Sequence, residues 1–238
     1  MTLPKINAPE YSLVVPSTQV EVKYRPFLVK EEKLLLIAQE TGDEKALYTA
    51  IKNLIHNCCH GQLDVDTMPL FDVEYVFLQL RTKSVGEVAD VVIICPDDRE
   101  TEVTVKVNLT EIKVELPSQD HNKIQLTDDI GIVMAYPNLA SVLLTAGNTA
   151  EEKKVSDKMF DTILECMFQI WQGEEVFAIT DYTYKDKLDF IESLNHEQFE
   201  KVQEFFETMP TVKKEIEVTN PNTQVVSKVD IEGMNSFF

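Results

Sequence analysis

The stretch PLFDVEYVFLQLRTKSVGE, residues 69–87, constrains the fold of this chain more than any other. Pro69 suits the first turn of a helix, and cations followed by Gly86 suit its end. Between these ends the large apolar side chains are Phe71, Val73, Tyr75, Val76, Phe77, Leu78 and Leu80. They are too many for the single apolar stripe of a surface helix. We therefore expect a helix that other elements cover on most of its sides.

A β-hairpin and two amphipathic helices are predicted before this helix. Residues 11–16 and 19–27 flank a Ser-Thr turn, and the second run alternates apolar and polar side chains as strands do. One helix runs from about residue 30 to a break at 41–43. The next covers about 43–58, and its apolar stripe is Leu47, Ala50, Ile51, Leu54, Ile55 and Cys58.

Two similar β segments follow later in the chain. Residues 88–96 and 102–116 read as strands joined by a polar turn. Residues 212–238 repeat this arrangement, with Pro221 in the place of Pro96 and a shorter turn. We therefore predict two related hairpins.

Mainly helical sequence lies between the two hairpins. Residues 130–150 carry no charge, but a Pro-Asn pair interrupts them, so we expect a buried strand and then a helix rather than a membrane span. A helix is predicted over 152–171, with one broad apolar face of Met159, Phe160, Ile163, Leu164, Met167, Phe168 and Trp171. Two more are predicted over 187–194 and 196–209, the last capped by Asn195.

These patterns predict an α+β fold with an N-terminal hairpin, a mainly helical core and two further β-hairpins. We expect four segments along the chain. They are an N-terminal hairpin with helices over 1–86, a hairpin insertion over 87–127, a helical part of the same core over 128–211, and a C-terminal hairpin with a tail over 212–238.

The charge of the chain limits its partners. Lys and Arg total 22 against 41 Asp and Glu, a net charge of −19. Nucleic acid and anionic lipid both attract cationic proteins, so we expect neither nucleic acid nor a membrane as a partner. An acidic decoy that mimics nucleic acid and occupies a basic protein stays open as an alternative function. The few cysteines and the absence of an apolar leader in MTLPKINAPEYSLVVP indicate a reducing cytoplasm.

The stretch IHNCCHG raises the question of a metal site. On a helix that continues to residue 60, His56, Cys59 and His60 share one face and are ligand types that zinc accepts. However, Cys58 continues the apolar stripe, and Gly61 suits the residue after a helix end. We therefore predict no metal site here, and a small zinc-binding protein using these three residues stays as an alternative.

Catalytic motifs do not stand out in the sequence. It has no G-x-S-x-G, no phosphate-binding glycine loop and no H-E-x-x-H. We predict that the chain is not an enzyme, with no catalytic residues and no cofactor. Recognition through the surface is better supported, because the sequence closes on Phe237 and Phe238, which either pack on their own domain or dock on a partner.

Several stretches resemble the baseplate hub assembly proteins of T-even-type contractile-tailed bacteriophages. They are residues 23–38, 71–87, 123–137 and 190–210, followed by the closing IEGMNSFF. The resemblance implies a non-enzymatic assembly factor, chaperone or hub component that acts by protein–protein contacts. Its implied partners are hub and tape-measure proteins, with self-association left open. It would act in the host bacterial cytoplasm during assembly, and its presence in the virion baseplate is left open.

The same resemblance bears on the two later hairpins. Some relatives carry paired cysteines there, which suggests zinc ribbons, whereas here Cys95 stands alone and the second turn reads Asn-Pro-Asn-Thr. We therefore expect degenerate zinc-ribbon-like hairpins without metal. For partner contacts we predict exposed parts of the two helical motifs and the closing residues. These are Tyr75, Arg81, Lys83, Phe205, Phe206, Met209, Phe237 and Phe238.

Overall fold

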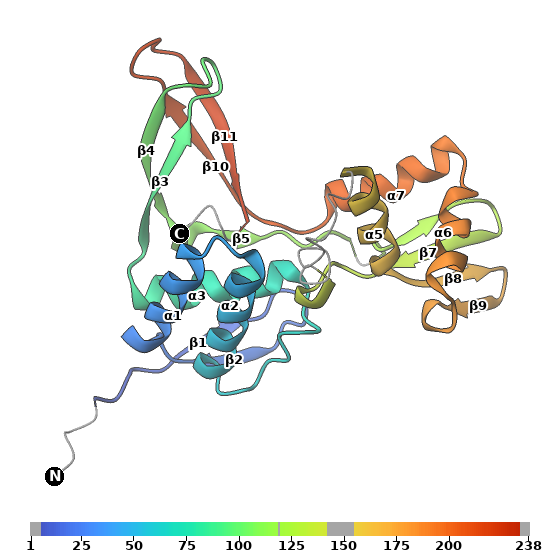
Figure 1. The fold of residues 1–238 in the computed structure, drawn as a ribbon, viewed down its shortest axis with the longest axis horizontal. Coiled ribbons are helices and arrows are strands. Elements are labelled where there is room, and N and C mark those ends of the chain that lie inside the picture. Colours follow the sequence, from blue (N-terminus) through green and yellow to red (C-terminus); the bar gives the residue numbers. More distant parts are fainter. Residues whose placement is uncertain (1–5, 119, 142–154, 234–238) are drawn as a thin grey trace. The chain divides into compact units, whose positions relative to one another are not determined.

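The structure is a computed structural model that describes residues 6–118, 120–141 and 155–233 (Figure 1). The fold is α+β, as predicted. Contacts group the chain into two compact units: unit 1 comprises 1–115 with 211–238, and unit 2 comprises 116–210. This grouping follows contacts, whereas the four segments expected above follow the order of elements along the chain and stay a prediction.

Unit 1 combines three helices with small antiparallel sheets. In chain order its elements are β1 (Tyr11–Val14), β2 (Glu21–Tyr24), α1 (Val29–Glu40), α2 (Glu44–Cys58), α3 (Leu70–Ser84), β3 (Val88–Ile94), β4 (Glu102–Asn108), the 3-10 turn η1 (Leu109–Glu111), β5 (Lys113–Val114), β10 (Val212–Thr219) and β11 (Val226–Glu232). The N-terminal hairpin, the two helices after it and the two later hairpins form where the sequence predicts them, but the strand expected over 102–116 ends at Asn108, and Lys113–Val114 pairs with β10 instead.

Helix α3 is the buried helix that its composition requires. The buried side chains on it include Phe71, Val73, Val76, Phe77, Leu78 and Leu80. The helix also buries Asp72, whose carboxylate accepts hydrogen bonds from the Ser17 backbone N–H at 3.1 Å and from the Ser17 hydroxyl. A buried carboxylate is costly without donors. The pair therefore fixes the turn of the β1–β2 hairpin against α3.

The two later hairpins lie side by side in Figure 1. β3 pairs with β4, and β10 lies between β11 and β5. Alternate residues of both hairpins face inward and share one core. Its buried members are Leu78, Ala89, Val91, Ile93, Cys95, Val107, Leu109, Ile112, Val212, Val218 and Ile231.

The turns of three hairpins in unit 1 have the same conformation. Residues 15–19, 95–99 and 220–224 each place proline second and a residue with positive φ fifth, at 56°, 57° and 62°. In each turn the first carbonyl accepts the backbone N–H of the fifth residue, at 2.8, 2.9 and 2.9 Å. From the sequence, only the second and third turns are predicted to be related. The likeness between VPSTQV and NPNTQV shows that the first belongs with them.

Unit 2 is a four-stranded antiparallel sheet with helices. Its described elements are β6 (Lys123–Gln125), β7 (Ile130–Met134), α5 (Val155–Cys166), β8 (Met167–Gln172), β9 (Glu175–Ala178), the 3-10 turn η2 (Ile179–Asp181), α6 (Tyr184–Glu192) and α7 (His196–Thr208). The strand expected in the charge-free segment is β7, and residues 142–150 of that segment lie outside the described residues. The Asn195 cap is confirmed, because its side chain accepts the Gln198 N–H at 2.9 Å.

The long helix predicted over 152–171 is wrong at its end. It stops at Cys166, and the following residues form β8 between β7 and β9. The sequence there is rich in aromatic and β-branched side chains, which favour strands. Gly173 follows with φ of 58°, as the first residue of a two-residue hairpin loop requires. Strand pairing therefore outweighs the helical spacing that Phe168 and Trp171 share with α5.

Candidate interaction surfaces

The predicted zinc candidates do not form a ligand cluster. Cys59 is buried, and burial raises the pKa of its thiol to about 12. His60 has left the helical conformation, with φ of 56°, and its Nε2 lies 3.4 Å from a Glu10 carboxylate oxygen. The His56 ring instead packs against Gly61. Within the part of the chain that the structure describes, no three His, Cys, Asp or Glu side chains gather as metal ligands do.

A polar cluster joins the tips of the two later hairpins. Of the positions where zinc ribbons would place cysteines, only residue 95 is a cysteine, and residues 98, 220 and 223 are Asp, Asn and Thr. Here the buried Asn220 amide donates to Asp97 at 3.0 and 3.1 Å and to Asp98 at 2.8 Å. The Thr223 hydroxyl donates to Asp97 at 2.5 Å.

Through these hydrogen bonds the Asn220 amide links the two hairpins. Its Oδ1 also accepts the backbone N–H groups of Asn222 and Thr223, at 2.8 and 3.3 Å. Hydrogen bonds from Thr101 lower the pKa of Asp98, so its carboxylate stays charged and accepts strongly. A side-chain network therefore holds the two tips together.

An apolar groove lies between α1 and α2, with a cavity volume of about 420 Å³. Leu34 and Ile37 of α1 form its exposed apolar wall, at 59% and 47% of their full exposure. Small side chains, including Ala46 and Ala50 of α2, leave the opposite wall hollow. On its outer side α1 exposes further apolar side chains, Val29 and Leu36. Large apolar side chains gathered on one exposed helix mark an interaction surface.

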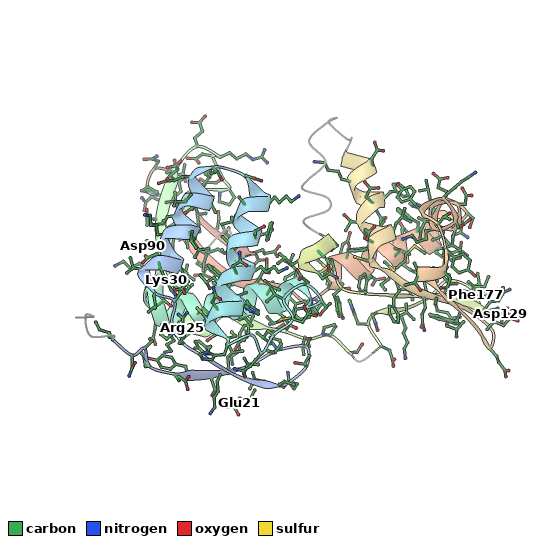
Figure 2. The ribbon with its side chains drawn as sticks, turned by 60° about the horizontal axis from the view of Figure 1, so that its bottom comes forward. Glu21, Arg25, Lys30, Asp90, Asp129 and Phe177 are labelled. Atoms are coloured by element: carbon green, nitrogen blue, oxygen red, sulfur yellow. The ribbon has the colours of Figure 1, made fainter. Side chains whose placement is uncertain are left out.

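An ion pair fixes α1 at the edge of this groove. The Arg25 guanidinium lies 2.9 Å from the Glu31 carboxylate, whose side chain is only 5% exposed, and Lys30 lies 3.4 Å from the same oxygen. Arg25 and Lys30 are labelled in Figure 2. The other Glu31 oxygen accepts the Leu28 N–H at 2.8 Å. Burial raises the pKa of Glu31, but these hydrogen bonds outweigh it and lower the pKa overall. Because the Arg25 backbone N–H also binds the Cys58 carbonyl, the pair ties β2 and α1 to α2.

Unit 2 has a second apolar hollow, of about 310 Å³, between the sheet and α6. Ile130, Ile170 and Phe177 line it from the strands, and Phe190 lines it from the helix. Phe177, labelled in Figure 2, belongs to the short outer strand β9. No helix of the described residues is long and apolar enough to cross a membrane.

Comparison with known families covers nearly the whole chain. The family model described as T4 bacteriophage base plate protein matches residues 8–238. The chain belongs to this family. No curated protein and no solved structure is similar enough to the chain to count as a match. As a base plate protein it has phage proteins as its partners and a place in the tail.

The three contact residues predicted on α3 of this base plate protein differ in how far contacts within unit 1 already occupy them. Tyr75 packs partly buried against the core of the two hairpins. The Lys83 ammonium pairs with Glu87 at 2.9 Å and lies 5.7 Å from the centre of the Tyr11 ring. Arg81 is half-buried, burial lowers its pKa, and its Nη1 has no hydrogen-bond partner within the described residues. A buried guanidinium nitrogen without a partner is costly.

The contact residues predicted in unit 2 lie at the end of α7. Phe205 is buried and stacks near Tyr136, while Phe206 is partly buried and meets Phe205 edge-on with ring centres 5.1 Å apart. Met209 is half-buried just after the helix. Phe237 and Phe238 lie outside the described residues. The α1 surface was missed, although its signal was present in the run of apolar residues LLLIA, which exceeds what one helical stripe holds.

Proposed function

We propose that this base plate protein is a non-enzymatic hub assembly protein that acts by protein–protein contacts. Its partners are the hub and tape-measure proteins of the same phage, and it acts in the host cytoplasm while the tail is built. Family membership supports a role in the base plate. The α1–α2 groove is the observation that supports contact as the mode of action.

The groove suits an apolar side chain or helix of a hub protein. Its walls are mostly apolar, and Leu34 and Ile37 are too exposed to serve the core of unit 1. Burying an exposed Leu or Ile side chain contributes about 1.5–3 kcal/mol. Two such residues would supply the central contacts of a specific interface. The α3 and α7 residues named above, and Phe237 with Phe238, are proposed as additional contacts.

The test is co-purification from cells that express the chain with tagged hub or tape-measure protein. Leu34→Glu and Ile37→Glu should each lower recovery of the complex by about tenfold or more, because each places a charge in an apolar contact. Val20→Glu is the matched control, since Val20 is 56% exposed just before β2, away from α1, and does not line the groove. Complexes that survive both groove variants would exclude the groove, and a wild-type chain that binds no base plate protein would exclude the function.

A second measurement separates an assembly factor from a hub component. Mass spectrometry of purified virions should detect a hub component at a fixed ratio to other base plate proteins. An assembly factor should appear only in extracts of infected cells.

A further inference from the structure

Strand β3 has an open edge. The Leu109 N–H binds the Glu87 carbonyl at 2.8 Å and the Cys95 N–H binds the Thr101 carbonyl at 2.8 Å, just beyond the two ends of the β3–β4 ladder. In an antiparallel pair, hydrogen-bonded residues recur at every second position. The β3–β4 register runs without a shift, so odd-numbered β3 residues bind β4. The N–H and C=O groups of the even-numbered residues therefore point away from β4.

The same even-numbered residues carry exposed side chains. Val88, Val92 and Ile94 are 54%, 61% and 56% exposed, and Asp90 is exposed between them. Asp90 lies at the periphery of unit 1 in Figure 2. No described residue forms a backbone hydrogen bond with these positions along the open edge. An apolar strand with unpaired backbone groups is a template for a further strand.

The neighbouring strand edges are protected, whereas β3 is not. The outward row of β4 carries Glu102 and Lys106, and that of β11 carries Lys228 and Asp230. Charged side chains, lysine above all, are the usual protection against unwanted strand pairing. The outward row of β3 has Asp90 as its only charge. Of the hairpin strands β3, β4 and β11, β3 therefore has the least protected edge.

We infer that the β3 edge receives an extended segment of a partner protein by strand addition. The segment has β-branched residues at alternate positions and one Lys or Arg opposite Asp90. Residues opposite each other on paired strands have Cβ atoms about 4.5–5.5 Å apart, so a cation there would meet the carboxylate directly. The net charge of −19 also attracts a basic segment and repels a second copy of this chain. This inference rests on the proposed function, because it names a site and a partner chemistry for it.

Two proline variants test the edge in the full chain. Val92 and Thr104 face each other in the register, and the N–H of neither is used between β3 and β4. Val92→Pro should lower recovery of a co-expressed hub or tape-measure protein by about tenfold, because it removes one donor from the open edge. Thr104→Pro, the matched control, should leave recovery unchanged. Circular dichroism of both variants checks that the hairpin still folds.

Labelled peptides test the charge requirement. A nine-residue peptide of alternating valine and threonine with a central lysine should bind the wild-type chain about tenfold tighter than the same peptide with glutamate. Asp90→Lys should reverse this preference, since like charges directly opposite are unfavourable. Hydrogen exchange should show protection at the β3 amides on binding.

The outcomes separate this inference from the proposed function. Hub recovery that is equal for wild type and Val92→Pro, with a folded hairpin, overturns the edge and leaves the proposed function standing. Equal binding of the two peptides overturns the charge requirement. A wild-type dimer that Val92→Pro abolishes assigns the edge to a second copy and also overturns the inference.

Discussion

Replacing Gly131 by alanine tests how the sheet of unit 2 is packed. Gly131 of β7 faces Trp171 of β8 in the register. A Cβ on Gly131 would lie 2.0 Å from Trp171 Cζ2, 2.3 Å from Cη2 and 2.5 Å from Cε2. The indole ring therefore occupies the space that any other residue would need. The strand has room for glycine alone while the ring stays in place.

The expected cost follows from these distances. Ordinary contact begins near 3.4 Å, so the ring must retreat by about 1.4 Å. Inserting a methyl group into packed structure costs about 1–3 kcal/mol. Trp171 is only partly buried, so it has an exit toward solvent. We expect Gly131→Ala to lower the free energy of unfolding by about 1–2 kcal/mol.

Tryptophan fluorescence during urea unfolding measures this effect. Trp171 is the single tryptophan of the chain, so its emission reports on this site alone. Gly131→Ala should lower the midpoint and shift the native emission to longer wavelength, because the ring becomes more exposed. In a Trp171→Ala background, followed by circular dichroism, the same change should cost less than half as much. An unchanged midpoint and spectrum in Gly131→Ala would refute the packing argument.

Three further variants probe polar contacts by urea unfolding. Asn220→Ala should lower the free energy of unfolding by about 2 kcal/mol, because it removes a buried amide that bonds Asp97 and Asp98 of the other hairpin, while Asn222→Ala on the exposed turn should cost less. Glu31→Gln should cost about 2 kcal/mol, because Arg25 loses its charged partner; no loss would contradict a stabilising pair. The pKa of His121 is lowered from 6.5, mainly by burial, so the folded state favours the neutral ring. Stability should therefore fall as pH drops below about 6.5, and His121→Gln should remove that slope.

The neutral ring of His121 has a defined role in the structure. The Thr208 hydroxyl donates to the Glu204 carbonyl, so it accepts from His121 Nε2 at 2.8 Å. His121 Nδ1 lies 3.1 Å from the Tyr136 hydroxyl and accepts from it when the ring is neutral. The histidine thereby links the start of the sheet to the end of α7.

Local sequence signals predicted most of the elements but not what packs against them. The composition of α3 required burial, and its flanking Pro69 and Gly86 marked its ends, so this helix was predicted closely. The error at β8 arose because Met167, Phe168 and Trp171 continue the helical spacing of α5. The residue that makes room for the Trp171 ring on the neighbouring strand, Gly131, is far away in sequence. Local sequence patterns do not predict a packing partner that is distant in the sequence.

The contact surfaces were harder to predict than the fold because exposure is a property of the assembled unit. Phe205 and Leu34 are both large apolar residues at helical spacing, yet one is 2% exposed and the other 59%. Helical spacing predicts the same burial for both residues. Their actual exposure depends on the elements that pack against each helix. The same holds for Val91 and Val92, where a single step along β3 changes a core residue into one on the open edge.

The shared turn explains how one chain uses the same hairpin in different ways. At 15–19 the turn is fixed by its own proline, its positive-φ residue and a buried carboxylate on α3. At 95–99 and 220–224 the same backbone instead presents side chains to a second hairpin. The backbone hydrogen bonds are equal in all three, so they cannot determine what each hairpin binds. That choice lies with the residues at the first, third and fourth positions of the turn, whose side chains meet the neighbouring element. The turn can therefore keep its shape while its contacts change.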